Sequence, residues 1–78
     1  MASYNRDGML IDVSVLSDGK VGSDGWVVEF WDLTPGGIGE FMHIHVDAHG
    51  NCTTERMVES VSESLTQWAL SIAKSELA

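Results

Sequence analysis

The chain is poor in cysteine, proline and basic residues. Its 78 residues include one Cys, one Pro and four Lys or Arg, against twelve Asp or Glu. A single Cys cannot form an intramolecular disulfide, which excludes the stapled scaffold typical of small secreted domains. The formal net charge of −8 excludes a conventional reader of nucleic acid, because such a protein needs a basic face to neutralise phosphates.

Long apolar runs are also missing, and no basic segment precedes an apolar stretch at the start of the sequence. We therefore expect no membrane-spanning helix, no signal peptide, no membrane partner and a cytoplasmic location. The hydrophobic fraction of 44% and the three Trp residues supply enough material for a folded core. A single small domain over residues 1–78 is predicted, and its stability should be low because short chains bury less of their surface.

Three segments alternate between apolar and polar residues with a period of two, which is typical of β-strands. They span residues 9–16, 26–33 and 40–48, and residues 1–8 are interpreted as a loose start. Turn-forming residues separate the three segments. These turns are Asp18-Gly19, Asp24-Gly25 and Thr34-Pro35-Gly36-Gly37.

The last third of the chain has the pattern of a helix. No Gly or Pro occurs in residues 54–78, and apolar residues recur there at spacings of three and four. This stripe consists of Val58, Val61, Leu65, Trp68 and Ile72. We predict a helix of about 20 residues, capped by Thr53 or Thr54.

The predicted fold is therefore α+β. It consists of a three-stranded antiparallel sheet (β-β-β-α) with one long C-terminal helix packed on one face. The predicted core centres on Trp26, Phe30, Ile44, Val61, Leu65 and Trp68. One helix covers only one face of a sheet, so the other face should stay uncovered in the monomer.

The uncovered face is the first candidate binding surface. Strand alternation places Trp31 and Phe41 on it, beside Asp12 and Glu29. Mixed faces with a central Trp are typical of interfaces. We expect this face to bind a partner, and a homodimeric structural subunit that pairs through the same face is an alternative.

A second candidate surface is acidic. Glu55, Glu59 and Glu63 repeat every four residues and would form a stripe on the outer face of the predicted helix. Together with the net charge of −8, this stripe would attract cationic surfaces. We hypothesise a non-catalytic inhibitor that blocks a basic surface of a nucleic-acid-handling partner, such as a nuclease or a CRISPR effector, without binding nucleic acid itself.

In size and charge the chain resembles phage anti-CRISPR proteins and bacterial toxin-immunity proteins. The resemblance implies the same kind of activity, in which carboxylates occupy a basic site on the partner. No motif in this chain identifies either family, so no functional residues carry over.

The histidines suggest a different chemistry. His43, His45, Asp47 and His49 recur at every second residue, so a strand would present all four on one face, and histidine pairs of this kind bind zinc. The string is similar to the His-x-His-x-Asp-His motif of the metallo-β-lactamase family, but Ala48 separates Asp47 from His49. That fold also needs a chain more than twice as long, so we reject the kinship. A metal-binding protein or small metalloenzyme remains an alternative, while the main expectation is no cofactor and no metal.

Two further features are weak candidates for catalysis. Cys52 has three His within nine residues, which would allow a Cys-His hydrolase, but no family motif surrounds it. The glycine-rich segment from Gly36 to Gly39 lacks the Lys of a phosphate-binding loop, and a predicted strand follows it instead of a helix. We therefore expect no enzymatic activity.

Overall fold

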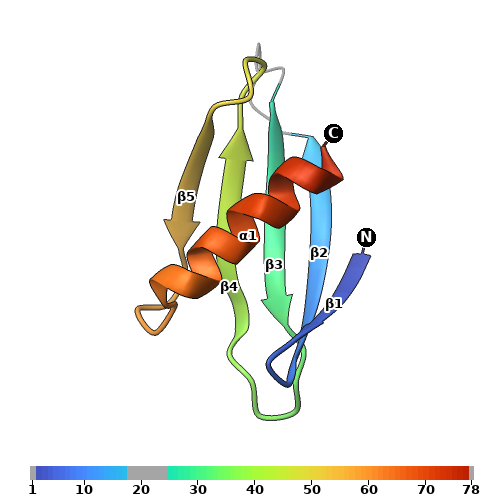
Figure 1. The fold of residues 1–78 in the computed structure, drawn as a ribbon, viewed down its shortest axis with the longest axis vertical. Coiled ribbons are helices and arrows are strands. Elements are labelled where there is room, and N and C mark those ends of the chain that lie inside the picture. The colour runs from blue at the N-terminus through green and yellow to red at the C-terminus, as the bar shows by residue number, and fades with distance from the viewer. Residues whose placement is uncertain (1, 18–24, 78) are drawn as a thin grey trace.

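The computed structural model describes residues 2–17 and 25–77. Within these ranges the chain forms one five-stranded antiparallel sheet and one helix, and the strands lie side by side in the order in which they occur in the chain. Helix α1 crosses one face of the sheet diagonally (Figure 1). The elements are β1 (Ala2–Arg6), β2 (Met9–Ser17), β3 (Trp26–Asp32), β4 (Gly39–Val46), β5 (Cys52–Arg56) and α1 (Glu63–Glu76).

The predicted three-stranded sheet is wrong, although the α+β class is compatible with the structure. At one edge, residues that we interpreted as a loose start form β1, which pairs antiparallel with β2 from Ala2↔Val13 to Arg6↔Met9. Asp7 and Gly8 turn the chain with φ of 51° and 82°. An Asp-Gly pair in which both residues have positive φ is typical of a two-residue hairpin turn. The sequence Asp7-Gly8 therefore indicated a strand before β2.

At the other edge, β5 replaces the start of the predicted helix. Thr53 and Thr54 pair with His45 and Ile44 of β4, and β-branched residues fit a strand better than a helix. No Gly or Pro marks the boundary between strand and helix, so a search for helix breakers could not find it. The observed helix has 14 residues and is therefore shorter than predicted.

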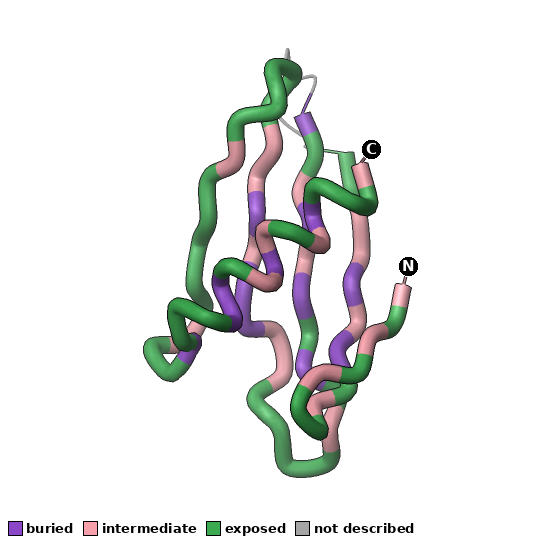
Figure 2. Tube along the Cα trace, in the orientation of Figure 1, coloured by how far each residue is buried: buried purple, intermediate pink, exposed green. Residues whose placement is uncertain are grey.

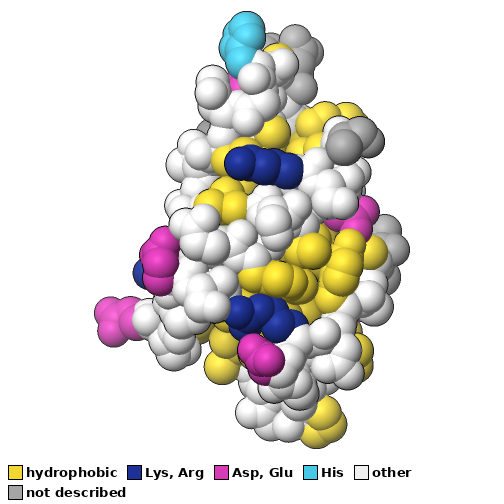
Figure 3. Space-filling view, viewed as in Figure 1, with side chains coloured by type: hydrophobic (Ala, Val, Ile, Leu, Met, Phe, Trp, Pro, Cys, Tyr) yellow, Lys and Arg dark blue, Asp and Glu magenta, His cyan; other side chains and the backbone are white. Residues whose placement is uncertain are grey.

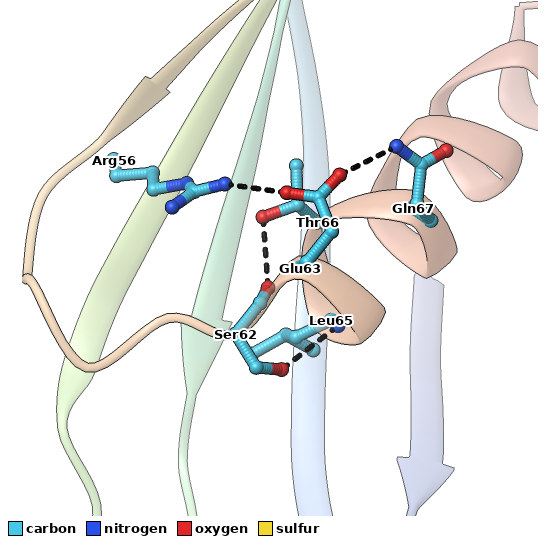
Figure 4. A network of polar contacts seen from close by, with 6 residues as sticks. All are labelled: Arg56, Ser62, Glu63, Leu65, Thr66 and Gln67. Carbon is cyan, nitrogen blue, oxygen red and sulfur yellow. Dashed lines mark hydrogen bonds and ion pairs between the residues drawn. The ribbon is translucent and has the colours of Figure 1, made fainter.

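Ser62 begins the helix. Its Oγ accepts a hydrogen bond from the backbone N–H of Leu65 at 3.1 Å, and its carbonyl accepts one from the Thr66 hydroxyl at 2.9 Å (Figure 4). The cap satisfies a backbone donor that the first turn of a helix leaves free. Ala69 and Ala73 are both fully buried, and these small side chains let the helix lie close to the sheet.

The hydrophobic core lies between α1 and the sheet, where the buried segments of strands and helix face one another (Figure 2). Of the predicted core residues, Phe30, Ile44, Val61 and Leu65 are buried, and Trp68 packs against them while partly exposed. Trp26 is 45% exposed, so its assignment to the core was wrong. It begins β3 at the end of the sheet, where the core no longer surrounds it.

The connection between β3 and β4 is the turn that the sequence predicted. The buried carboxylate of Asp32 accepts hydrogen bonds from the backbone N–H groups of Thr34, at 3.0 Å, and Ile38, at 3.2 Å. A bond to the Thr34 side chain, followed by these backbone bonds, holds the pKa of Asp32 below its usual range. A Cβ atom on Gly37 would lie 2.5 Å from Asp32 Oδ2, so the turn needs glycine there. Of the other two predicted turns, Asp18-Gly19 and Asp24 lie outside the described residues.

Candidate functional site: an acidic sheet face

The face of the sheet that α1 leaves uncovered is the candidate functional site. Residues directly opposite each other on paired strands share a face, so the strand register assigns the side chains. Asp12 lies opposite Trp31, and Trp31 lies opposite Glu40; in the next row Glu29 lies opposite His43, and His43 lies opposite Glu55. We call this surface the acidic sheet face and define it as Asp12, Glu29, Trp31, Glu40, His43 and Glu55.

A β-bulge in β4 creates part of this face. The β3–β4 register shifts between Phe30 and Trp31, because Phe30 pairs with Met42 and Trp31 pairs with Glu40. Phe41 is the extra residue, and its ring turns inward to lie 6.2 Å from that of Phe30. A bulge changes the face to which the following side chains point. It thereby places Glu40 on the same face as His43, although regular alternation would separate residues three apart.

His43 lies between two carboxylates. Its Nε2 is 3.1 Å from Glu40 Oε1 and 3.4 Å from Glu29 Oε2, and each of the three side chains is between 21% and 24% exposed. The Nε2 atom itself is buried and makes no hydrogen bond. Ligand atoms of the three side chains all lie within 4.8 Å of one another. The ring of His45 packs edge-on at 6.3 Å from that of His43.

Trp31 is the exposed aromatic side chain of this face. It is 37% exposed and stands between Asp12 on β2 and Glu40 on β4. The Ser3 hydroxyl donates a hydrogen bond to Asp12 Oδ1 at 2.7 Å and orients that carboxylate. An indole flanked by two carboxylates suits a guanidinium group, which can stack on the ring and pair with the acids.

The basic residues that the structure describes lie on the opposite side of the sheet. Arg6 donates to Ser64 Oγ at 2.8 Å and stacks on Trp68 of the helix, and Arg56 pairs with Glu63 at 3.1 Å. Lys74 belongs to α1 itself. Figure 3 shows basic side chains over the helix-covered side. Among the described residues, every Lys and Arg is therefore on this side, and the acidic sheet face has none.

Two of the predicted binding features are corrected by these positions. Phe41 is fully buried, so it is not on the uncovered face where alternation placed it. The predicted helical stripe of glutamates does not exist, because Glu55 lies in β5, Glu59 precedes the helix and Glu63 begins it. Asp12, Glu29, Trp31 and Glu55 do lie on the uncovered face.

Glu63 is engaged within the fold. Its carboxylate accepts hydrogen bonds from Gln67 Nε2, at 2.9 Å, and from Arg56, at 3.1 Å (Figure 4). The bond from Gln67, together with the positive charge of Arg56, holds the pKa of Glu63 below its usual range. An acid that is already paired is a poor contact for a basic partner.

The histidine string is divided between a strand and a turn. His43 and His45 lie in β4, which ends at Val46. Asp47 Oδ1 instead accepts hydrogen bonds from the backbone N–H groups of His49 and Asn51, each at 2.9 Å. The bonds from Asn51 come first among the causes that hold the pKa of Asp47 below its usual range. The predicted four-residue metal strand is therefore not assembled, and only His43 joins a cluster of possible ligands.

Cys52 lies on the helix-covered side, in a pocket of about 400 Å³ lined also by Trp26, Lys74 and Leu77. The cysteine begins β5 opposite Val46, so the sheet separates it from His43 and His45. Neither His43 nor His45 can therefore pair with Cys52, as a Cys-His hydrolase that uses β4 would need.

Sequence reasoning missed Glu40, because alternation along 40–48 assigned it to the same face as Met42. One signal was present: Phe41 and Met42 are adjacent large apolar residues, and a regular strand cannot bury both on one face. Such a pair indicates a bulge when both residues are needed in the core.

Comparison with known proteins does not assign this chain to a class. No protein-family model matches it, and neither a curated protein nor a solved structure is similar enough to count as a match. Within residues 2–17 and 25–77, no helix is both long and apolar enough to cross a membrane.

Proposed function

We propose that the protein is a non-catalytic binding domain that docks its acidic sheet face onto a basic surface of a partner protein. The observation that carries this proposal is that the described basic residues are confined to one side of the sheet, so the carboxylates of the uncovered face have no basic neighbour on that face. Asp12, Glu29, Glu40 and Glu55 share the uncovered face, and the described Lys and Arg side chains lie on the other side. Complementary potentials of this kind attract a partner and set its orientation.

Trp31 is the central contact in this proposal. Binding energy is concentrated in a few residues, among which Trp and Arg are enriched. A partner arginine stacked on Trp31 would have Asp12 and Glu40 within reach on either side. Removing Trp31 should therefore weaken the complex more than removing any one carboxylate.

The charge also favours one kind of partner over another. Two copies of this chain that met face to face would oppose four carboxylates of one copy with four of the other, and juxtaposed like charges oppose association. The carboxylates would instead pair with a surface rich in Lys and Arg. The nucleic-acid-binding site of a nuclease or a CRISPR effector is such a surface, because it neutralises phosphates. The protein would then act as an inhibitor by excluding nucleic acid.

A peptide titration tests the docking surface. An oligo-arginine peptide is added to isotopically labelled protein, and the amide chemical shifts are followed by NMR. We expect the largest changes in β2, β3 and β4 around Trp31, and weaker binding at higher salt, because exposed charges are screened beyond about 8–10 Å at physiological ionic strength. Changes confined to α1 would contradict the proposal.

Matched variants sharpen this experiment. Trp31→Ala should reduce peptide affinity by about tenfold, since a cation–π contact contributes about 1–2 kcal/mol. Trp26→Ala is the control, because Trp26 is also exposed but lies on the helix-covered side by its pairing with Val46. Asp12→Asn should weaken binding, and Glu59→Gln, with the same loss of charge outside the face, should not. Equal losses for both Trp variants would refute the face assignment.

Competition tests the inhibitory part of the proposal. The protein is added to preformed complexes between duplex DNA and a nuclease or a CRISPR effector, and the release of DNA is measured. Release that is lost in Trp31→Ala but not in Trp26→Ala supports inhibition. If the peptide binds the acidic sheet face but no such complex releases its DNA, the partner belongs to another class of basic protein.

A further inference from the structure

We propose that Glu29, Glu40 and His43 form a three-ligand site for a divalent transition-metal ion. The inference does not depend on the proposed function, because it rests on the geometry of three side chains and not on the charge of the whole face. Two strands supply the ligands: Glu29 comes from β3, and Glu40 and His43 come from β4.

The separations of the donor atoms fit metal coordination. A tetrahedral ion with bonds of about 2.0–2.1 Å to nitrogen and oxygen holds its donors about 3.3 Å apart. His43 Nε2 lies 3.1 Å and 3.4 Å from the nearest oxygens of Glu40 and Glu29. These two nitrogen–oxygen separations match those around a bound ion, and all three donor atoms lie within 4.8 Å of one another.

The state of His43 Nε2 is a second and independent observation. The atom is buried within the fold yet has no hydrogen-bond partner, although buried polar atoms nearly always have one. The nearest oxygens of Glu40 and Glu29 lie 3.1 Å and 3.4 Å from the nitrogen without forming a hydrogen bond with it. A metal ion between the three groups would bind the nitrogen lone pair and both carboxylates at once, and it would give Nε2 the partner that hydrogen bonding does not supply.

The ligand chemistry identifies the class of ion. Imidazole nitrogen favours zinc and its first-row neighbours, whereas calcium and magnesium prefer sites made of oxygen alone. Three protein ligands leave at least one position for water or for a group of another molecule, as in zinc sites with an open position.

The bulge in β4 explains why this site exists. Without the register shift between Phe30 and Trp31, Glu40 would point to the opposite face and only Glu29 would remain beside His43. Bulges frequently redirect a side chain in this way next to functional sites. The burial of Phe41 in the core keeps the bulge in place, so folding itself assembles the three ligands.

Titration with Zn²⁺ tests the site, using protein without a polyhistidine tag. Isothermal titration calorimetry should show one equivalent of Zn²⁺ per chain, and Co²⁺ should give visible absorption that Zn²⁺ abolishes and excess Mg²⁺ does not. Glu40→Gln keeps the size of the side chain and should weaken Zn²⁺ binding by at least about tenfold, since even changes outside the ligand shell cost 10–100-fold. His43→Ala should abolish binding, with the amide NMR spectrum confirming that the variants are folded.

His49→Ala and Glu59→Gln are the matched controls, because they remove the same kinds of group outside the site and should leave Zn²⁺ affinity unchanged. Trp31→Ala should also retain Zn²⁺ while losing oligo-arginine, so that failure of the metal site and failure of the docking surface can be told apart. Absence of Zn²⁺ binding to the folded wild-type protein, or equal losses in His49→Ala and His43→Ala, would overturn the proposal.

Discussion

The two faces of the sheet are made of alternate residues of the same strands, yet they differ in burial and in charge. The helix-covered face contributes Ile11, Val13, Val28, Phe30 and Ile44 to the core. The uncovered face carries carboxylates, His43 and a partly exposed Trp31. The covered face provides the stability of the domain. The uncovered face can therefore hold several like charges, whose burial in a core would cost a large amount of free energy.

The largest expected loss of stability comes from a substitution on the covered face. Phe41→Ala should lower the free energy of unfolding by about 3–5 kcal/mol, because it leaves a cavity beside Phe30. Trp31→Ala, one face away, should lower it by about 1 kcal/mol or less, as for most substitutions outside the core. Urea denaturation of both variants measures the difference. Similar losses for the two would show that Phe41 is not the inward residue of the bulge.

The turn that joins the two central strands should give the next largest effect. Gly37→Ala should destabilise the fold by about 1–3 kcal/mol, as overpacking does, because the new Cβ would lie 2.5 Å from Asp32 Oδ2. The same change in an Asp32→Ala background should cost less, since the clashing carboxylate is gone. A double-mutant cycle in urea measures this coupling, and additive losses would contradict the close approach.

The N-terminal cap of α1, the helix that covers the sheet, should make a smaller contribution to stability. Ser62→Ala should lower stability by about 1 kcal/mol, because the backbone N–H of Leu65 loses its acceptor. Thermal unfolding followed by circular dichroism checks this, with Ser60→Ala as the matched control just outside the cap. If Ser60→Ala proves the more damaging change, the helix does not begin where the structure places it.

Acidification gives the smallest expected difference, and it acts through Asp32 at the covered side of the sheet. The pKa of Asp32 is lower in the folded protein than its ordinary value, so its stabilising contribution is present above the unfolded pKa and is lost as the pH falls through the folded one. The wild type should therefore lose stability between about pH 5 and about pH 3 more steeply than Asp32→Asn. Identical slopes for the wild type and Asp32→Asn would contradict the assignment.

Most of the secondary structure within the centre of the chain could be read from local pattern. Alternation over 9–16, 26–33 and 40–48 identified β2, β3 and β4, because β2 and β3 alternate between a core and an exposed face and β4 does so after its bulge. The apolar spacing of Leu65, Trp68 and Ile72 identified the helix, but not its start, since nothing but the Ser62 cap separates it from the preceding segment. The edge strands β1 and β5 were not predicted, because they are only shallowly buried and their residues are mostly polar.

The sequence by itself determined the charge of −8, the absence of a disulfide framework and the alternation that makes a two-faced sheet. Only the tertiary structure decided which acids are free and which are paired, because that depends on strand register and on the position of α1. The bulge is the clearest case. It moves Phe41 into the core and Glu40 beside His43, and it forms because burying both Phe41 and Met42 stabilises the fold more than a regular ladder would. The adjacent apolar pair signals that the regular pattern is interrupted, but which residue each strand face receives is decided only when the core is packed.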